Sequence, residues 1–233
     1  MKTSGGTTAQ KRRAGEAAAA LVEDGMVVGL GTGSTAAHAI RAIGEHVADG
    51  LDVRGVPTSF DTRRLAREAG IPLADLDEVV GPDAPGIDLA IDGADQVADG
   101  QLVKGGGAAH CREKIVDSTA DRFVVVADPS KEVTTLDHPV PVAVHPDAWT
   151  VVCEAVRTAG GEPTLREASA KDGPVVTDNG NLVLDCDFGE IADPASLATT
   201  LSGTAGVVEH GLFVDLADAV YVGTDDGVRT LEL

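Results

Sequence analysis

A lysine, three consecutive glycines and a glutamate lie close together in the stretch KGGGAAHCREKI, residues 104–115. The carboxylate of Glu113 could act as a general base, and the compact ammonium of Lys104 could polarise an oxygen that gains negative charge. The glycines let the backbone come close to a ligand. The stretch could therefore hold a small anionic substrate against a base, although an ordinary flexible turn has a similar composition.

Lysine is scarce in this chain, so the position of each lysine is informative. The six are Lys2, Lys11, Lys104, Lys114, Lys131 and Lys171. Lys104 and Lys131 fall in predicted loops, whereas Lys114 lies just inside a predicted helix and is expected to be structural or exposed. His110 and Cys111 are expected to pack rather than act as base and nucleophile, because no third residue suggests a catalytic triad.

A second candidate site is the stretch GLGTGST, residues 29–35, between an apolar run and a helical pattern. N–H groups at a helix start favour an anion, and Thr32, Ser34 and Thr35 add hydroxyl donors. The stretch has neither the G-x-G-x-x-G of dinucleotide sites nor the G-K-[ST] of a nucleotide P-loop. It favours a site for a single phosphate; a tight strand-to-helix turn with an N-cap is the alternative.

A third candidate is DGAD, residues 92–95, at the end of an apolar strand pattern. Ligands of open α/β sheets bind outside the carboxyl ends of the strands. Asp92 and Asp95 could accept hydrogen bonds from sugar hydroxyls, although Asp-Gly also forms ordinary turns. Two carboxylates could also suggest a metal, but no third ligand group is evident and the six histidines form no H-x-H or H-E-x-x-H pattern. No metal is therefore expected.

The elements that must position these stretches alternate between strand and helix patterns up to about residue 134. Helices are expected at 9–24, after GLGTGST, at 60–70 and from Glu113 onward, with apolar strands between them. The alternation predicts a parallel, Rossmann-like α/β sheet.

The pattern changes after that point. HPVPVAVHP, with its three prolines, suits an edge strand or a domain crossing, and GPVVTDNGNLVLDCDFG reads as a hairpin with an Asn-Gly turn. The sequence thus predicts an α/β catalytic domain at 1–134 plus 207–233, and an inserted, smaller α+β domain of ferredoxin-like type at 135–206.

Composition narrows the class of protein. Asp and Glu number 38 against 18 Lys and Arg, a net charge of −20, which argues against binding to nucleic acid or anionic membranes. Salt screens such self-repulsion, so a salt-rich cytoplasm is favoured over an ordinary one. Three widely spaced cysteines fit a reducing compartment, and neither a signal peptide nor a membrane span is evident.

Taken together, these stretches closely resemble the type A ribose-5-phosphate isomerases. The matching segments are GLGTGSTAAH, PTS at 57–59, DGAD, KGGGAA, REKI, DPSK, GEPTLR, TDNGN and GVVEHGLF. They keep the family's order along nearly the whole chain. One departure is Gln96, where the family commonly has Glu after DGAD.

The resemblance implies a cofactor-free enzyme that interconverts D-ribose 5-phosphate and D-ribulose 5-phosphate, a step of the non-oxidative pentose phosphate pathway. It implies a cytoplasmic homodimer or homotetramer. Glu113 takes the place of the proton acceptor, and Asp92 and Lys104 are the other expected catalytic residues. The substrate contacts that it implies are Thr32, Gly33, Ser34, Thr35, Asp92, Gly93, Ala94, Asp95, Lys104, Gly105, Gly106, Gly107 and Lys131.

The chemistry expected is transfer of a proton between C2 and C1 through a cis-enediolate, with Glu113 as the base. Lys104 and the glycine N–H groups would stabilise the oxyanion, and Asp92 or Asp95 could assist ring opening. Two other readings stay open at this point. They are a sugar-phosphate deaminase on a related scaffold and a non-catalytic sugar-phosphate sensor.

Overall fold

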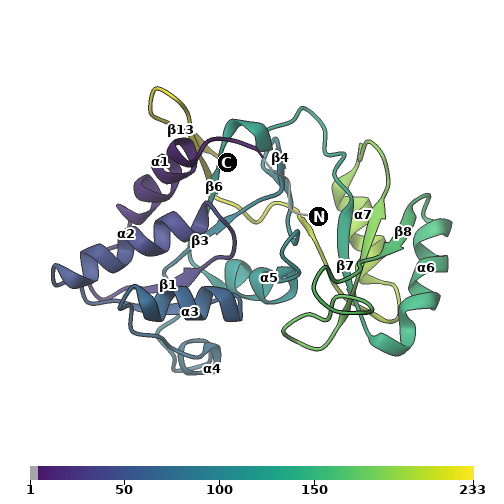
Figure 1. The fold of residues 1–233 in the computed structure, drawn as a ribbon, viewed down its shortest axis with the longest axis horizontal. Coiled ribbons are helices and arrows are strands. Elements are labelled where there is room, and N and C mark those ends of the chain that lie inside the picture. Colours follow the sequence, from purple (N-terminus) through teal and green to yellow (C-terminus); the bar gives the residue numbers. More distant parts are fainter. Residues whose placement is uncertain (1–4) are drawn as a thin grey trace. The chain divides into compact units, whose positions relative to one another are not determined.

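A computed structural model describes residues 5–233 of the chain (Figure 1). Its contacts divide these residues into two compact units. The larger comprises residues 5–94, 112–132 and 216–233, and the smaller comprises 95–111 and 133–215.

The larger unit is built on a six-stranded sheet. Its strand order is β13-β12-β6-β3-β1-β2, and every neighbouring pair is parallel except β12 with β13. The strands are β1 (Val27–Leu30), β2 (Arg54–Pro57), β3 (Leu89–Gly93), β6 (Phe123–Ala127), β12 (Ala219–Gly223) and β13 (Val228–Glu232). This arrangement confirms the predicted parallel α/β sheet.

Helices cover both faces of this sheet, which explains why its inner strands are apolar along their whole length. The helices are α1 (Thr8–Ala19), α2 (Ala36–Ala48), α3 (Phe60–Glu68), α4 (Leu76–Val79) and α5 (His110–Thr119). The first two residues of α5, His110 and Cys111, group with the smaller unit. Val28 and Leu30 of β1 pack with α1 and α2, whereas Val27 packs with Val79 of α4 and Val116 of α5.

The smaller unit contains an antiparallel sheet of order β10-β7-β9-β8. Along the chain its elements are β7 (Val140–Val144), α6 (Trp149–Thr158), β8 (Glu162–Leu165), β9 (Leu182–Asp187), α7 (Pro194–Ser202) and β10 (Val207–His210). This is the βαββαβ sequence of the ferredoxin-like fold, as predicted. A three-stranded sheet completes the unit and consists of β4 (Gln96–Ala98), β5 (Gln101–Val103) and β11 (Leu212–Phe213).

Two local expectations differ from the structure in part. The proline-rich strand β7 is not an edge strand, because it lies between β10 and β9, whereas the alternative of a domain crossing agrees with the change of unit at Val133. It tolerates Pro141, which has no N–H, because the regular pairing with β10 ends at Val142, and the Pro141 carbonyl still accepts from Gly211 N at 2.7 Å. The first arm of the expected hairpin is not a regular strand: beside the Asn-Gly turn, Val176 forms an isolated bridge with Leu182 and Thr177 N donates to Asn181 O at 2.8 Å.

The contact-based units also divide the chain elsewhere than at the expected boundaries. Residues 95–111 and 207–215 group with the inserted segment 135–206, since β10 pairs with β7. The predicted boundaries between the two domains, at 134/135 and 206/207, stay a prediction. No helix among residues 5–233 is long and apolar enough to cross a membrane.

Candidate active site

The loop between β1 and α2 presents a row of backbone N–H groups. Within residues 5–233, the N–H groups of Gly33, Ser34 and Thr35 donate to no protein acceptor. Gly33 has a φ of +123°, which favours glycine, and no side chain caps the start of α2. N–H groups at a helix start attract anions. The loop therefore has the character expected of a phosphate site.

Thr32 belongs to the same loop, but its polar groups are turned to the protein. Its N–H donates to Asp92 Oδ1 at 2.9 Å, and its hydroxyl donates to Ser59 Oγ at 2.8 Å. The same hydroxyl lies 2.8 Å from Thr58 Oγ1 and 3.1 Å from Thr62 Oγ1. Nothing in the sequence indicates a role for Thr62, and Thr58 and Ser59 stand out only as part of the PTS segment that matches the family. This hydroxyl cluster holds the loop against the residues after β2.

Asp92 joins the first loop to the DGAD stretch. Its side chain is fully buried near the end of β3, and its Oδ1 accepts hydrogen bonds from the N–H groups of Thr32 and Gly93. Gly31 lies so close that a Cβ atom there would be 2.5 Å from Asp92 Cα. The end of β1 and the end of β3 are thus held together by one carboxylate.

Lys131 lies at the carboxyl end of the next strand in the sheet. After β6 the chain forms a 3-10 turn, Pro129–Lys131, which Asp128 caps by accepting from Ser130 N at 3.0 Å. Lys131 is only 7% exposed. Because β1, β3 and β6 are parallel neighbours, their carboxyl ends lie at one edge of the sheet, and so do the residues that follow them.

Glu113 lies in the first turn of α5 and is 4% exposed. The neighbouring Arg112 ties this turn to the sheet, since its Nε donates to the carbonyl of Pro57, the last residue of β2, at 2.9 Å. The larger unit thus brings Glu113, Asp92, Lys131 and the loop after β1 to the same edge of its sheet.

The remaining predicted residues belong to the smaller unit. Lys104 is 2% exposed, its backbone N–H donates to Gly211 O at 2.8 Å, and its Nζ lies 5.2 Å from the centroid of the Phe213 ring. A cation above an aromatic ring is attracted to the ring's negative face. The buried ammonium is thus held in place by both its backbone and an aromatic contact.

The glycine turn after Lys104 uses its three N–H groups differently. The Gly106 N–H donates to Asp95 Oδ2 at 2.6 Å. In the described part of the chain, the N–H groups of Gly105 and Gly107 have no protein acceptor. Of the three amides predicted to stabilise an oxyanion, two thus have no protein partner and one is engaged by a predicted site residue.

His110 supports this turn by packing. Its ring lies against Gly105, where an added Cβ atom would be 2.7 Å from Nδ1, and its Nε2 accepts from Ala143 N at 3.1 Å. Gly105 has a φ of +99°, so both space and backbone conformation require glycine there.

Gln96, the departure from the family pattern, does not point into the glycine turn. Its Oε1 accepts from the N–H groups of Asp137 and His138, each at 2.9 Å, and its Nε2 donates to the Asp137 carboxylate. A glutamate would place a second carboxylate beside Asp137. The amide is therefore matched to this neighbour.

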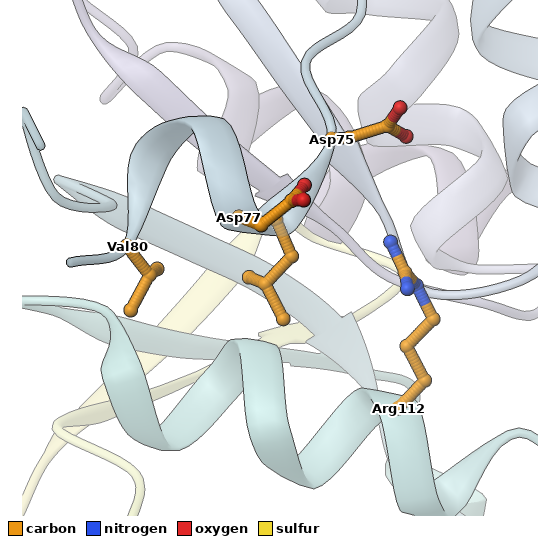
Figure 2. A pocket seen from close by; sticks show the side chains of 5 residues that line it. Asp75, Asp77, Val80 and Arg112 are labelled. Carbon is orange, nitrogen blue, oxygen red and sulfur yellow. The ribbon is translucent and has the colours of Figure 1, made fainter.

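A separate pocket of about 450 Å³ lies in the larger unit and is lined by Asp75, Leu76, Asp77, Val80 and Arg112 (Figure 2). In Figure 2 the Arg112 guanidinium points toward the two aspartates. None of the predicted site residues lines this pocket. Among residues 5–233, no group of three or more His, Cys, Asp or Glu side chains could hold a metal ion.

Comparison with known proteins places these features in a family. The family model described as ribose 5-phosphate isomerase A (phosphoriboisomerase A) matches residues 54–227. Ribose-5-phosphate isomerase A of Halorubrum lacusprofundi is 70% identical over 98% of both chains, and that of Natronomonas pharaonis is 67% identical over 98% of this chain and 99% of the relative.

Solved structures agree. Ribose 5-phosphate isomerase A from Methanocaldococcus jannaschii has a TM-score of 0.91 at 45% identity, covering 96% of this chain and 98% of that chain. A D-ribose-5-phosphate isomerase in complex with phospho-erythronic acid has a TM-score of 0.92 at 44% identity, with the same coverage. The chain belongs to the ribose 5-phosphate isomerase A family.

Proposed function

We propose that the protein interconverts D-ribose 5-phosphate and D-ribulose 5-phosphate, as an aldose–ketose isomerase of the non-oxidative pentose phosphate pathway. One observation carries the proposal beyond family membership. A nearly buried carboxylate, Glu113, lies at the same sheet edge as a loop with vacant N–H donors, where a phosphate would be held. An isomerase of sugar phosphates needs both a base and an anchor for the phosphate.

The phosphate end of the substrate would bind to the N–H groups of Gly33, Ser34 and Thr35, with Lys131 adding positive charge. Thr32 would act mainly by shaping the loop, since its N–H and hydroxyl are engaged by the protein. Binding energy from the phosphate contacts would orient the reacting carbons, which have few polar groups of their own for the protein to bind.

Glu113 would remove the proton from one carbon and return it to the next. The negative charge that develops on the oxygens of the cis-enediolate would be stabilised by Lys104 and by the glycine turn. A positioned base of this kind contributes roughly 10²- to 10⁴-fold to the rate.

The DGAD stretch would hold sugar hydroxyls. Gly93 and Ala94 would contribute through their backbone, and Asp92 or Asp95 would exchange a hydroxyl proton as the furanose ring opens. Asp95 already accepts from Gly106 N, and Asp92 from two N–H groups, so both carboxylates are held in one orientation.

The proposed setting is a salt-rich cytoplasm, and the proposed assembly is a homodimer or homotetramer. The charge of −20 supports the former, because high salt shortens the range of repulsion between carboxylates. No metal or cofactor has a part in the proposed reaction.

The test is a direct assay of ketose formation in molar KCl with ribose 5-phosphate, and with glucosamine 6-phosphate as the comparison substrate. We expect turnover of ribose 5-phosphate alone, without added cofactor. Release of ammonia from glucosamine 6-phosphate, with no ribulose 5-phosphate from ribose 5-phosphate, would contradict the proposal.

A further inference from the structure

Arg166, which follows strand β8, reaches the glycine turn of the smaller unit. Its Nη1 donates to the carbonyls of Gly105 and Gly106 at 3.0 and 3.2 Å. The side chain is only 10% exposed, so these bonds are shielded from water.

The other edge of the guanidinium is fixed by Asp185 on β9. Arg166 Nε donates to Asp185 Oδ2 at 2.9 Å, and Nη2 donates to Oδ1. The Asp185 side chain is 16% exposed. Such a two-point fork holds the plane of a guanidinium in a way that a single contact cannot. Asp185 thus sets the direction in which Nη1 points.

The geometry of the peptide bond carries this restraint to the N–H groups of the turn. In a trans peptide the carbonyl of one residue and the N–H of the next point in opposite directions. Arg166 holds the Gly105 carbonyl, and the Gly106 N–H on the same peptide points the other way, to Asp95 Oδ2. Arg166 and Asp95 therefore hold this first peptide from opposite sides.

The next peptide is held from one side only. Arg166 holds the Gly106 carbonyl, so the Gly107 N–H must point away from the guanidinium. Gly107 is exposed, and within the described residues its N–H has no protein acceptor. The turn is further constrained where Ala108, at a φ of +62°, donates its N–H to the Gly105 carbonyl at 2.9 Å.

We propose that Arg166, held by Asp185, is a positioning residue that aims the Gly107 N–H at the oxygen that becomes negative in the enediolate. The inference rests on the proposed isomerase function. Without Arg166 the Gly106–Gly107 peptide can rotate, because both flanking residues are glycines with little conformational preference. The donor is then no longer preorganised, and the interaction made in the transition state is weakened more than substrate binding.

The experiment compares wild-type protein, Arg166→Lys and the matched control Arg157→Lys in molar KCl. Arg157 is an exposed arginine of the same unit that pairs with Glu154. A lysine at 166 keeps a charge beside Asp185 but cannot donate to a carboxylate and two carbonyls in one plane. We measure the melting temperature, kcat and KM for ribose 5-phosphate, and the affinity for phospho-erythronic acid, whose carboxylate resembles an enediolate.

For Arg166→Lys we expect kcat to fall roughly 10- to 100-fold, below the 10²- to 10³-fold typical of losing a whole oxyanion donor. KM should stay within about threefold, and the affinity for phospho-erythronic acid should fall in step with kcat/KM. Arg157→Lys should match the wild type. An unchanged kcat, or a rise in KM that accounts for the whole loss, would overturn the proposal.

If Arg166→Lys does not fold, the variant Asp185→Asn tests the same proposal. It keeps the arginine but weakens the fork, so kcat should fall about three- to tenfold at unchanged KM; a wild-type kcat would overturn the proposal. Failure of the underlying function is distinguishable, because the wild-type protein would then not convert ribose 5-phosphate at all.

Discussion

Replacing Gly31 by alanine tests whether the loop after β1 and Asp92 act as one unit. A Cβ atom at position 31 would lie 2.2 Å from Asp92 Oδ1 and 2.5 Å from Asp92 Cα. The second distance decides the outcome, because a backbone atom cannot swing aside like a side chain. Restoring an ordinary contact of 3.4 Å to Cα requires the two strand ends to separate by about 0.9 Å.

Such a shift affects function more than stability. The bonds from Thr32 N and Gly93 N to Asp92 Oδ1, at 2.9 and 2.6 Å, would be stretched or broken. Overpacking of this kind costs about 1–3 kcal/mol of folding free energy, which a domain of this size can tolerate. A displacement of about 1 Å in a substrate-holding group can cost on the order of 100-fold in rate. We therefore expect kcat/KM for ribose 5-phosphate to fall about 100-fold.

The matched control is Gly81→Ala, because the nearest atom to a Cβ atom at position 81 is 4.0 Å away. Both variants are assayed for kcat/KM in molar KCl, and their melting temperatures are compared. Gly81→Ala should behave like the wild type in both measurements. If Gly31→Ala retains kcat/KM within about threefold of this control, the coupling of the loop to Asp92 is refuted.

Three further predictions concern stability. Gln96→Glu should lower the free energy of unfolding by about 1–2 kcal/mol in chemical denaturation. The substitution replaces the amide that donates to the Asp137 carboxylate by a second carboxylate. Equal stability of wild type and variant would contradict this. Burial raises the pKa of Asp185, but hydrogen bonds and charge from Arg166 outweigh it, so the pKa lies below its ordinary value of 3.8. The stabilisation from Asp185 is therefore present above about pH 4 and lost as the pH falls through the lowered pKa; the stability difference between wild type and Asp185→Asn should shrink in acid, and a constant difference would refute the assignment. Finally, the melting temperature should rise from low to molar KCl, since the net charge is −20; no rise would contradict the screening argument.

The parts of the fold predicted best from the sequence are those set by local pattern. Fully apolar strands such as β6 mark a sheet covered on both faces, and the polar residues after β1, β3 and β6 come at the carboxyl ends of parallel strands. The positions of Ser34, Asp92 and Lys131, at or just after the ends of these strands, could therefore be predicted from the sequence. Their gathering at one sheet edge follows from the strand order.

What the sequence could not predict depends on pairing between distant segments. Pro141 looked like an edge-strand residue, yet β7 has a neighbour on each side because β10 pairs with it from a distant part of the chain, with Val207 opposite Val144 and His210 opposite Val142. Thr32 stays a predicted substrate contact, but the hydrogen bonds of its N–H to Asp92 and of its hydroxyl to Ser59 could not be predicted from the sequence. Arg166 entered only as the last residue of the matching segment GEPTLR, without a role, since only the tertiary structure brings it to the glycine turn.

The central claim is that Glu113 moves the proton, and one measurement tests it most directly. Glu113→Gln keeps the size of the side chain but removes the base, and Glu45→Gln, at an exposed position of α2, is the matched control. Interconversion of ribose 5-phosphate and ribulose 5-phosphate is followed in molar KCl, together with the affinity for phospho-erythronic acid. We predict a fall in kcat of roughly 10²- to 10⁴-fold for Glu113→Gln while the ligand still binds, and no change for Glu45→Gln. Isomerisation by Glu113→Gln at a rate near that of the wild type would contradict the claim.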